Sequence, residues 1–101
     1  MRPGVAPFSA RSPRVVAARR LHRRRARDQA GLFLAEGPQA VREAAGHVVE
    51  LFGTAEALTI HGDALSAAAD APVWTVTDAA LDALAETVHP QGLVAVCRHL
   101  D

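Results

Sequence analysis

Residues 31–38, Gly-Leu-Phe-Leu-Ala-Glu-Gly-Pro, contain the pattern from which the fold of this 101-residue chain can be worked out. Residues 32–35 are a short apolar run, and glycine or proline stands on both sides of it. A short apolar run bounded by such breakers is typical of a buried strand. Pro38 can occupy the first turn of a helix, and the alanines and valine up to residue 46 follow helical periodicity. The segment therefore predicts a buried strand followed directly by a helix.

The same alternation continues towards the C-terminus. Further apolar runs predict strands at residues 48–52, 73–76 and 93–97. Composition and periodicity predict helices at about 55–58, at 63–69 and from the capping residue Thr77 to about 84. Strands that alternate with helices imply a mostly parallel sheet covered on both faces. We therefore predict an α/β fold in one domain, a three-layer α/β/α sandwich with about four mostly parallel strands.

Positive charge is concentrated at the N-terminus. Residues 1–27 contain nine arginines and no acid (+9), whereas residues 28–101 contain two arginines and eleven acids (−9). Ser12-Pro13 predicts the cap and first residue of a helix that extends to about Ala26. Its arginines recur at i, i+4 and repel one another, which weakens the end of the helix unless an anion binds. Such segregation of charge indicates a polyanionic partner, with nucleic acid as the first candidate.

Catalytic and metal-binding residues show no recognisable pattern. The glycines do not form G-x-G-x-x-G, the serines lack G-x-S-x-G, and Cys97 with His99 supplies too few ligands for zinc. A single cysteine favours a reducing, cytoplasmic location. The apolar runs are shorter than the ~20 residues of a membrane span, so no membrane partner is expected. The arginine-rich start also resembles an organelle transit peptide, but Pro3, Pro7 and Pro13 interrupt the amphipathic helix that such a peptide needs.

Several motifs follow one another in a recognisable order. The basic helix that starts at Ser12-Pro13-Arg14-Val15 precedes Phe33-Leu34-Ala35-Glu36-Gly37 and then Val41-Arg42-Glu43-Ala44. Near the C-terminus, Thr87-Val88-His89-Pro90-Gln91-Gly92 precedes a hydrophobic run. This succession resembles the SpoU (TrmH-like) rRNA ribose 2'-O-methyltransferases, in which a basic helix precedes Phe-x-x-Glu-Gly, Val-x-Glu-Ala and Thr-x-x-Pro-Gln-Gly. The resemblance covers about residues 12–100.

The resemblance implies a fold similar to that of ribosomal proteins that bind kink-turn RNA. It divides the chain into a flexible leader, residues 1–11, and an RNA substrate-binding domain, residues 12–100. In this family a following knotted domain transfers a methyl group from S-adenosylmethionine, and its cofactor motifs do not occur here. We therefore expect this chain to be non-catalytic by itself, without a cofactor, as a piece of a longer enzyme or as a stand-alone relative. The expected partner is rRNA, 23S in particular, and the longer enzyme is expected to form a homodimer through its catalytic domain.

The residues that the resemblance implies to face RNA form two groups. The basic helix and its exit contain Arg14, Arg19, Arg20, Arg23, Arg24, Arg25 and Arg27. The turns at the strand ends contain Glu36, Gly37, Gln39, His89, Gln91 and Gly92. At position 39 the family often has histidine, so Gln39 departs from the pattern. The structural alternatives are a solvated face for the arginines, a helix cap for Glu36 and simple turn geometry for Gln91 and Gly92.

A protein-interaction module is the alternative function. The basic arm and the acidic body could pair between copies of the chain, and such binding would also weaken with salt. Truncation of residues 1–27 separates the two hypotheses, because RNA binding should be lost whereas a dimer built on the folded body should survive.

Overall fold

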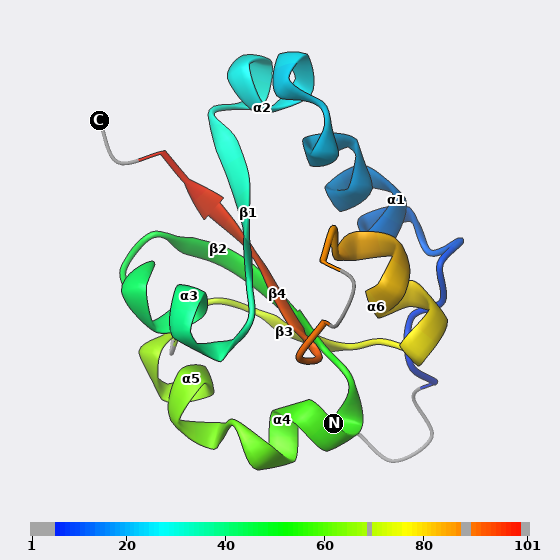
Figure 1. Ribbon diagram of the computed structural model, residues 1–101, viewed down its shortest axis with the longest axis vertical. Helices are drawn as coiled ribbons and strands as arrows, with labels where there is room; N and C mark the ends of the chain where they lie inside the picture. The colour runs from blue at the N-terminus through cyan, green and yellow to red at the C-terminus, as the bar shows by residue number, and fades with distance from the viewer. Residues whose placement is uncertain (1–5, 69, 88–89, 100–101) are drawn as a thin grey trace.

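A four-stranded sheet forms the centre of the molecule (Figure 1). The computed structural model describes residues 6–68, 70–87 and 90–99. The strands lie in the order β1-β4-β2-β3. Their bounds are Leu32–Glu36 for β1, Val48–Gly53 for β2, Val73–Thr75 for β3 and Leu93–Arg98 for β4. Each strand coincides with a predicted apolar run, which confirms the predicted number of strands.

The direction of one strand differs from the prediction. β2 and β3 are parallel, but β4 lies between β1 and β2 and is antiparallel to both. β1, β2 and β3 thus run the same way, and only β4 is reversed. The reason is the place at which β4 begins. The Gly37 N–H donates to the Leu93 carbonyl (2.9 Å) and the Thr54 N–H donates to the Gly92 carbonyl (3.1 Å), so β4 starts beside the carboxyl ends of β1 and β2. The prediction of a mostly parallel sheet is therefore wrong for both pairings of β4.

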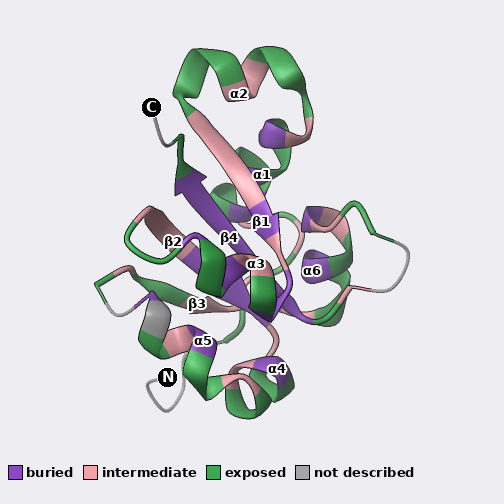
Figure 2. Cartoon of the chain, turned by 60° about the vertical axis from the view of Figure 1, so that its left-hand side comes forward, coloured by how far each residue is buried: buried purple, intermediate pink, exposed green. Residues whose placement is uncertain are grey.

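Helices cover both faces of the sheet, which confirms the predicted α/β sandwich. The bounds are Pro13–Arg19 for α1, Pro38–Glu43 for α3, Ala55–Ile60 for α4, Gly62–Ala67 for α5 and Asp78–Leu84 for α6. Alternate side chains of β4 enter two separate cores: Leu93, Ala95 and Cys97 pack towards α3, α4 and α5, whereas Val94 and Val96 pack towards α1 and α6. The central position of β4 makes it the most continuously buried strand (Figure 2).

Local polar contacts determine where several helices begin and how they are held. The Thr77 hydroxyl accepts from the Ala80 N–H (3.1 Å) and caps α6, as the sequence predicts. Thr54 caps α4 in the same way. Arg42 on α3 donates to the carboxylate of Asp63 on α5 (2.6 Å), and this hydrogen bond lowers the pKa of Asp63 below its ordinary value.

The basic segment is not the single helix that the sequence predicts. α1 is followed by a 3₁₀ turn, η1, at Arg20–His22, and then by a second helix, α2, at Arg24–Ala30. Arg23 is extended (φ −92°, ψ 130°) and separates the two helices. Leu21 is buried and the His22 ring contacts the Leu84 carbonyl, so the 3₁₀ turn is fixed to the body. The chain thus breaks within the run of like charges, where repulsion weakens a continuous helix.

The start of α1 also differs in detail from the prediction. Pro13 occupies the first turn, as expected. The Ser12 hydroxyl, however, does not cap the helix, because it accepts from the N–H of Ser9 (2.9 Å). Ser12 therefore closes a turn before the helix.

Part of the predicted flexible leader is integrated into the sheet. Phe8 forms a parallel bridge with Val76: its N–H donates to the Thr75 carbonyl and its own carbonyl accepts from the Thr77 N–H, both at 2.9 Å. Its ring stacks on Trp74 with centroids 5.3 Å apart. Phe8, which falls in the predicted leader, therefore contacts the edge of the sheet; residues 1–5 lie outside the described residues.

Replacement of Phe8 tests this contact. Phe8→Ala removes a half-buried ring and its stacking on Trp74, so we expect the free energy of unfolding to fall by about 2 kcal/mol. Urea unfolding followed by the fluorescence of Trp74, the only tryptophan, measures both the stability and the environment of the indole. Ser9→Ala is the neighbouring control, and equal stability of the two variants would show that the Phe8 contact contributes nothing.

Candidate nucleic-acid interface

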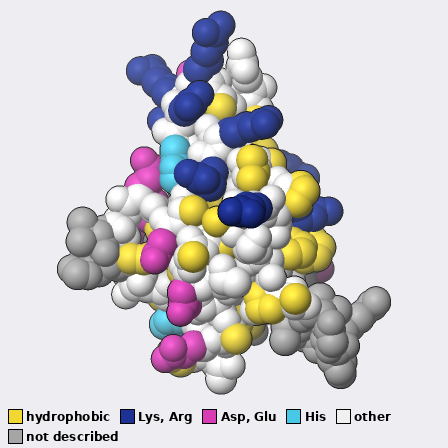
Figure 3. Space-filling model, turned by 90° about the vertical axis from the view of Figure 1, so that its right-hand side faces the viewer, with side chains coloured by type: hydrophobic (Ala, Val, Ile, Leu, Met, Phe, Trp, Pro, Cys, Tyr) yellow, Lys and Arg dark blue, Asp and Glu magenta, His cyan; other side chains and the backbone are white. Residues whose placement is uncertain are grey.

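The arginines of the N-terminal segment gather on one part of the surface. α1, η1 and α2 present them outwards, and Figure 3 shows them separated from the acids of the body. Arg19, Arg20, Arg23 and Arg25 are exposed and form no ion pair with the part of the chain that the structure describes. Arg24 lies 3.8 Å from Asp28 at i, i+4, with both side chains well exposed, a weak arrangement. We name these residues, Arg19, Arg20, Arg23, Arg24 and Arg25, the arginine surface.

A basic hollow lies within the arginine surface. It has a volume of about 370 Å³ and is lined by Val16, Arg19, Arg20, His22 and Arg23. The His22 ring nitrogen Nε2 lies 2.6 Å from the Leu84 carbonyl oxygen. A carbonyl can only accept, so Nε2 carries the proton and the ring is held in one orientation. The hollow therefore has guanidinium donors on its sides and no acid in its lining, which suits an anion such as a phosphate.

Arg27, predicted to face RNA, is instead used inside the domain. Its Nη1 donates to the carbonyls of Leu21 and His22, both at 2.9 Å. These carbonyls belong to the last turn before the break at Arg23, where a helix leaves carbonyls without partners. Arg27 thus ties α2 to the end of η1.

Arg14 also contacts the body of the domain. Its guanidinium lies 4.6 Å from the centroid of the Trp74 ring, and its Nη1 lies 3.4 Å from Glu50 Oε1. The Trp74 Nε1–H donates to the same oxygen (3.0 Å). Arg14 therefore joins α1 to the sheet through a cation–π contact and a shared carboxylate.

Glu36 has a role that neither sequence hypothesis contains. Its carboxylate accepts from the Glu86 N–H at 3.0 Å through both oxygens and from the Thr87 N–H at 3.3 Å. It does not cap α3, whose N-cap is Gly37 without a side-chain bond. Glu36 therefore fixes the loop between α6 and β4.

The remaining turn residues come together around the start of β4. Gly37 has φ +90°, and a Cβ there would lie 2.8 Å from Gln91 Oε1. Gly92 has φ +85°, and a Cβ there would lie 2.5 Å from the Cβ of Ala57. The positive φ favours glycine at both positions, and close packing against Ala57 requires it at Gly92 as well. Gln39 is exposed on α3, and His89 lies outside the described residues.

The two predicted groups do not form one site. α2 precedes the start of β1, whereas Gly37 and the start of β4 lie at its other end (Figure 1). Beside Gln91 is a hollow of about 300 Å³ whose charged residues are Glu56, Asp78 and Asp82. An acidic hollow repels phosphate, so electrostatics favours the arginine surface over this turn as a site for a polyanion.

Several residues that shape this interface were missed at the level of sequence. Glu50 receives both Arg14 and Trp74, and His22 orients the basic hollow. A charged residue inside the apolar run 48–52 was a usable signal for Glu50, because an acid in a predicted strand needs a partner. No local pattern pointed to His22, whose partner Leu84 lies 62 residues away.

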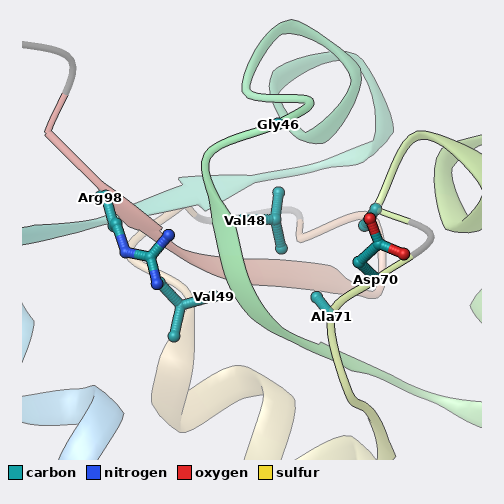
Figure 4. Close-up of a pocket in the computed structure, with 7 residues that line it drawn as sticks. Gly46, Val48, Val49, Asp70, Ala71 and Arg98 are labelled. Carbon is teal, nitrogen blue, oxygen red and sulfur yellow. The ribbon is translucent and has the colours of Figure 1, made fainter.

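Three features outside the arginine surface bear on catalytic, metal or cofactor chemistry: Cys97, the acidic and histidine side chains, and one further hollow. Burial raises the pKa of the Cys97 thiol to about 11, which makes it unreactive. No cluster of His, Cys, Asp and Glu among the described residues could hold a metal ion, and none of their helices has the length and apolarity needed to cross a membrane. The hollow of about 440 Å³ in Figure 4 is lined mainly by small residues, with Asp70 and Arg98 on opposite sides. It lacks converging groups of the kind that would hold S-adenosylmethionine.

The sequence belongs to a recognisable family of domains. Residues 12–95 match the model of the MRM3-like substrate binding domain. The chain belongs to this family. No curated protein sequence matches it significantly.

The fold of the chain is similar to part of several solved methyltransferase structures. An RNA 2'-O ribose methyltransferase superposes with a TM-score of 0.77 and 25% identity, over 95% of this chain and 38% of that chain. The SpoU methyltransferase AviRb from Streptomyces viridochromogenes, solved with AdoMet, superposes with a TM-score of 0.71 and 24% identity, over 90% of this chain and 37% of that chain. An rRNA methyltransferase from Sinorhizobium meliloti superposes with a TM-score of 0.71 and 20% identity, over 94% of this chain and 37% of that chain. The predicted relation to SpoU-type methyltransferases is confirmed, and the chain spans less than two fifths of these proteins.

Replacement of Arg27 separates structural from surface arginines. Arg27→Ala leaves two carbonyls of η1 without a donor, so we expect a loss of about 2 kcal/mol in unfolding free energy and faster amide exchange in residues 24–30. Arg25→Ala is the matched control, because Arg25 is exposed, and it should change stability little. Equal effects in urea unfolding and amide exchange would contradict the structural role of Arg27.

Two glycines with similar positive φ angles test the packing at the start of β4. Gly46 (φ +89°) has open space where a Cβ would be placed, whereas Gly92 (φ +85°) would meet Ala57. Gly46→Ala should cost about 1–2 kcal/mol from the positive φ alone, and Gly92→Ala should cost about 2 kcal/mol more from the clash. Thermal unfolding of the two variants measures the difference, and equal costs would refute the close contact.

Proposed function

We propose that this substrate-binding domain binds folded rRNA, 23S rRNA in particular, for a SpoU-type ribose 2'-O-methyltransferase. The observation that carries the proposal is the arginine surface: a set of exposed guanidinium groups, most of them without an acid partner among the described residues, on a domain of this family. RNA is the substrate class in the names of the structural relatives.

The physical basis is phosphate neutralisation. Each guanidinium can donate two parallel hydrogen bonds to a phosphate, and the basic hollow collects three arginines and His22 around one volume. Bringing a phosphate there relieves the repulsion between like charges on α1, η1 and α2. Arg14 and Arg27 hold the scaffold, and the arginine surface makes the contacts. The single tryptophan is covered by Phe8 and Arg14, so base stacking on it contributes little.

A second, uncharged contact is proposed at the turns. Gln39 and Gln91 are exposed, and an amide can donate to a phosphate or to a ribose hydroxyl without a net charge. The acidic hollow beside Gln91 makes this contact weaker than that of the arginines. Glu36, Gly37 and Gly92 would act there by shaping the loop, together with His89.

Cofactor binding and methyl transfer would be carried out by a longer enzyme that contains this domain. We propose that its methyltransferase domain uses S-adenosylmethionine, which supplies the methyl group, and that this domain mediates homodimerisation. The present domain would hold the RNA so that a ribose hydroxyl reaches that site, in the cytoplasm where rRNA is assembled.

A second candidate function has one observation in its favour. The acidic hollow of Glu56, Asp78 and Asp82 could receive the arginine surface of another copy. Such pairing would give self-association at low salt in the absence of RNA. Sedimentation of the domain alone across salt concentrations tests it.

The salt dependence of RNA binding tests the leading proposal. If about five phosphates are contacted, log K should fall with log[salt] with a slope of about −3.5 to −4.5 on a structured 23S rRNA fragment. Changing Arg19, Arg20, Arg23 and Arg24 to glutamine should make the slope about −1 or shallower and weaken binding strongly at low salt. Fluorescence anisotropy of labelled RNA gives both quantities.

Arginines elsewhere serve as the control for that experiment. Arg42→Gln with Arg98→Gln removes positive charge outside the arginine surface and should leave the slope unchanged. Equal losses in both sets of variants, or no RNA binding by the unmodified domain, would overturn the proposed function.

A further inference from the structure

A second hollow lies beneath the arginine surface, between the basic helices and the sheet. It has a volume of about 350 Å³, within the range of roughly 300–1,000 Å³ usual for ligand pockets. Its apolar lining comes from α1, η1 and α2 and from the strands β1 and β4. The apolar residues that line it and that the argument uses are Ala17, Leu21, Ala26, Ala30, Leu32 and Val96. We call it the apolar hollow.

The apolar hollow lies where α2 packs only partly on the body. α2 contains no fully buried residue, and its half-buried Ala26 and exposed Ala30 contribute only methyl groups to the lining. Arg27 holds the helix through the carbonyls of η1 rather than through a core. A helix normally buries an apolar stripe, so the open volume under α2 is an unfilled contact surface.

Polar groups stand at the margin of this volume. Glu50, Gln29 and Arg20 belong to its lining. Glu50 is held in place, because its Oε1 accepts from Trp74 and Arg14 and its side chain is only 18% exposed. A carboxylate can accept from the amino group of a base, and an amide can donate and accept. The hollow thus combines apolar walls with hydrogen-bonding groups, as a heterocyclic base requires.

The apolar hollow and the basic hollow are neighbours. Arg20 lines both of them. One is apolar with a polar margin, and the other is lined by arginines and His22 without an acid. A nucleotide has the same two parts, a base and a phosphate, joined through its sugar. The shared Arg20 and the arginine-lined hollow beside it favour this occupant over an uncharged apolar peptide, because positive charge attracts a phosphate-bearing ligand.

We propose that the apolar hollow receives an unpaired nucleobase of the RNA while a phosphate of the same strand lies in the basic hollow. The proposal rests on the proposed function and deepens it: it assigns to this face the reading of unpaired nucleotides, in addition to binding of the backbone. Recognition of RNA sequence depends on such unstacked bases, because side chains cannot read the deep groove of an RNA duplex.

The test uses a short hairpin RNA with a bulge that contains 2-aminopurine, whose fluorescence rises when the base leaves the stack. The unmodified domain should increase the fluorescence at saturation and should bind the bulged hairpin about tenfold more tightly than the fully paired hairpin. An abasic nucleotide at the same position should remove that advantage, and this comparison requires no change in the protein.

Filling the hollow provides the protein-side test. Ala26→Phe places a ring in the apolar hollow and keeps every arginine. Ala45→Phe is the control, because it adds the same ring at an exposed position just after α3. Ala26→Phe should lose the fluorescence increase and the roughly tenfold preference for the bulge, while its salt slope on the paired hairpin stays that of the unmodified domain. Ala45→Phe should behave as the unmodified domain. Circular dichroism checks that both variants are folded.

The outcomes separate the two proposals. Salt-dependent RNA binding without a fluorescence change, or with the same bulge preference in Ala26→Phe, would overturn the base pocket and leave the RNA-binding function standing. The first of these results is also expected if another protein domain covers the hollow. Absence of salt-dependent binding to any of the RNAs would instead overturn the proposed function itself.

Discussion

The position of β4 between β1 and β2 is the constraint on which the other features of the domain depend. Five of its six residues are buried, and their alternation supplies both cores at once. If β4 were at an edge, the helices on each face would cover a narrower sheet, and α1 would lose the valines against which it packs. The hydrogen bonds of Leu93 and Gly92 to the ends of β1 and β2 fix this position. The arrangement of Glu36, Gly37 and Gln91 is therefore first of all the structure that allows β4 to begin there.

The arginines divide into two kinds that have different physical roles. Arg14 and Arg27 contact the domain, Arg14 through an aromatic ring and a carboxylate and Arg27 through two helix-end carbonyls. Arg19, Arg20, Arg23 and Arg25 have solvent on their outer side and no ion pair within the described chain. The first kind supports the second, because Arg14 and Arg27 add polar ties to the apolar contacts that Val15, Ala18 and Leu21 make with the core. A count of positive charge along the sequence does not distinguish them.

The parts of this structure that are determined locally could be predicted from the sequence. The apolar runs marked the strands, and Thr77 marked the start of α6. The reversed direction of β4 could not be derived, because it depends on contacts of residue 93 with residue 37. Arg25 and Arg27 look equivalent in the sequence, and only the break at Arg23 brings one of them beneath η1. The contacts of Glu36 could not be derived from the sequence either, since their partners lie 50 and 51 residues away.

The same reasoning explains why the proposed interface is also the least consolidated part of the fold. α2 buries no residue, its arginines repel one another, and its main ties are the two hydrogen bonds of a single guanidinium. Local stability follows buried contacts, so α2 should open more readily than the strands. In the proposed complex, a polyanion would remove the repulsion, and a group that fills the apolar hollow would supply the missing packing. Binding and the ordering of α2 would then be coupled, and part of the favourable contact energy would be offset by the ordering of this helix. Under that proposal, a surface that is weak without its ligand would adjust to the shape of a folded RNA, whereas the sheet behind it would keep the position of that RNA defined.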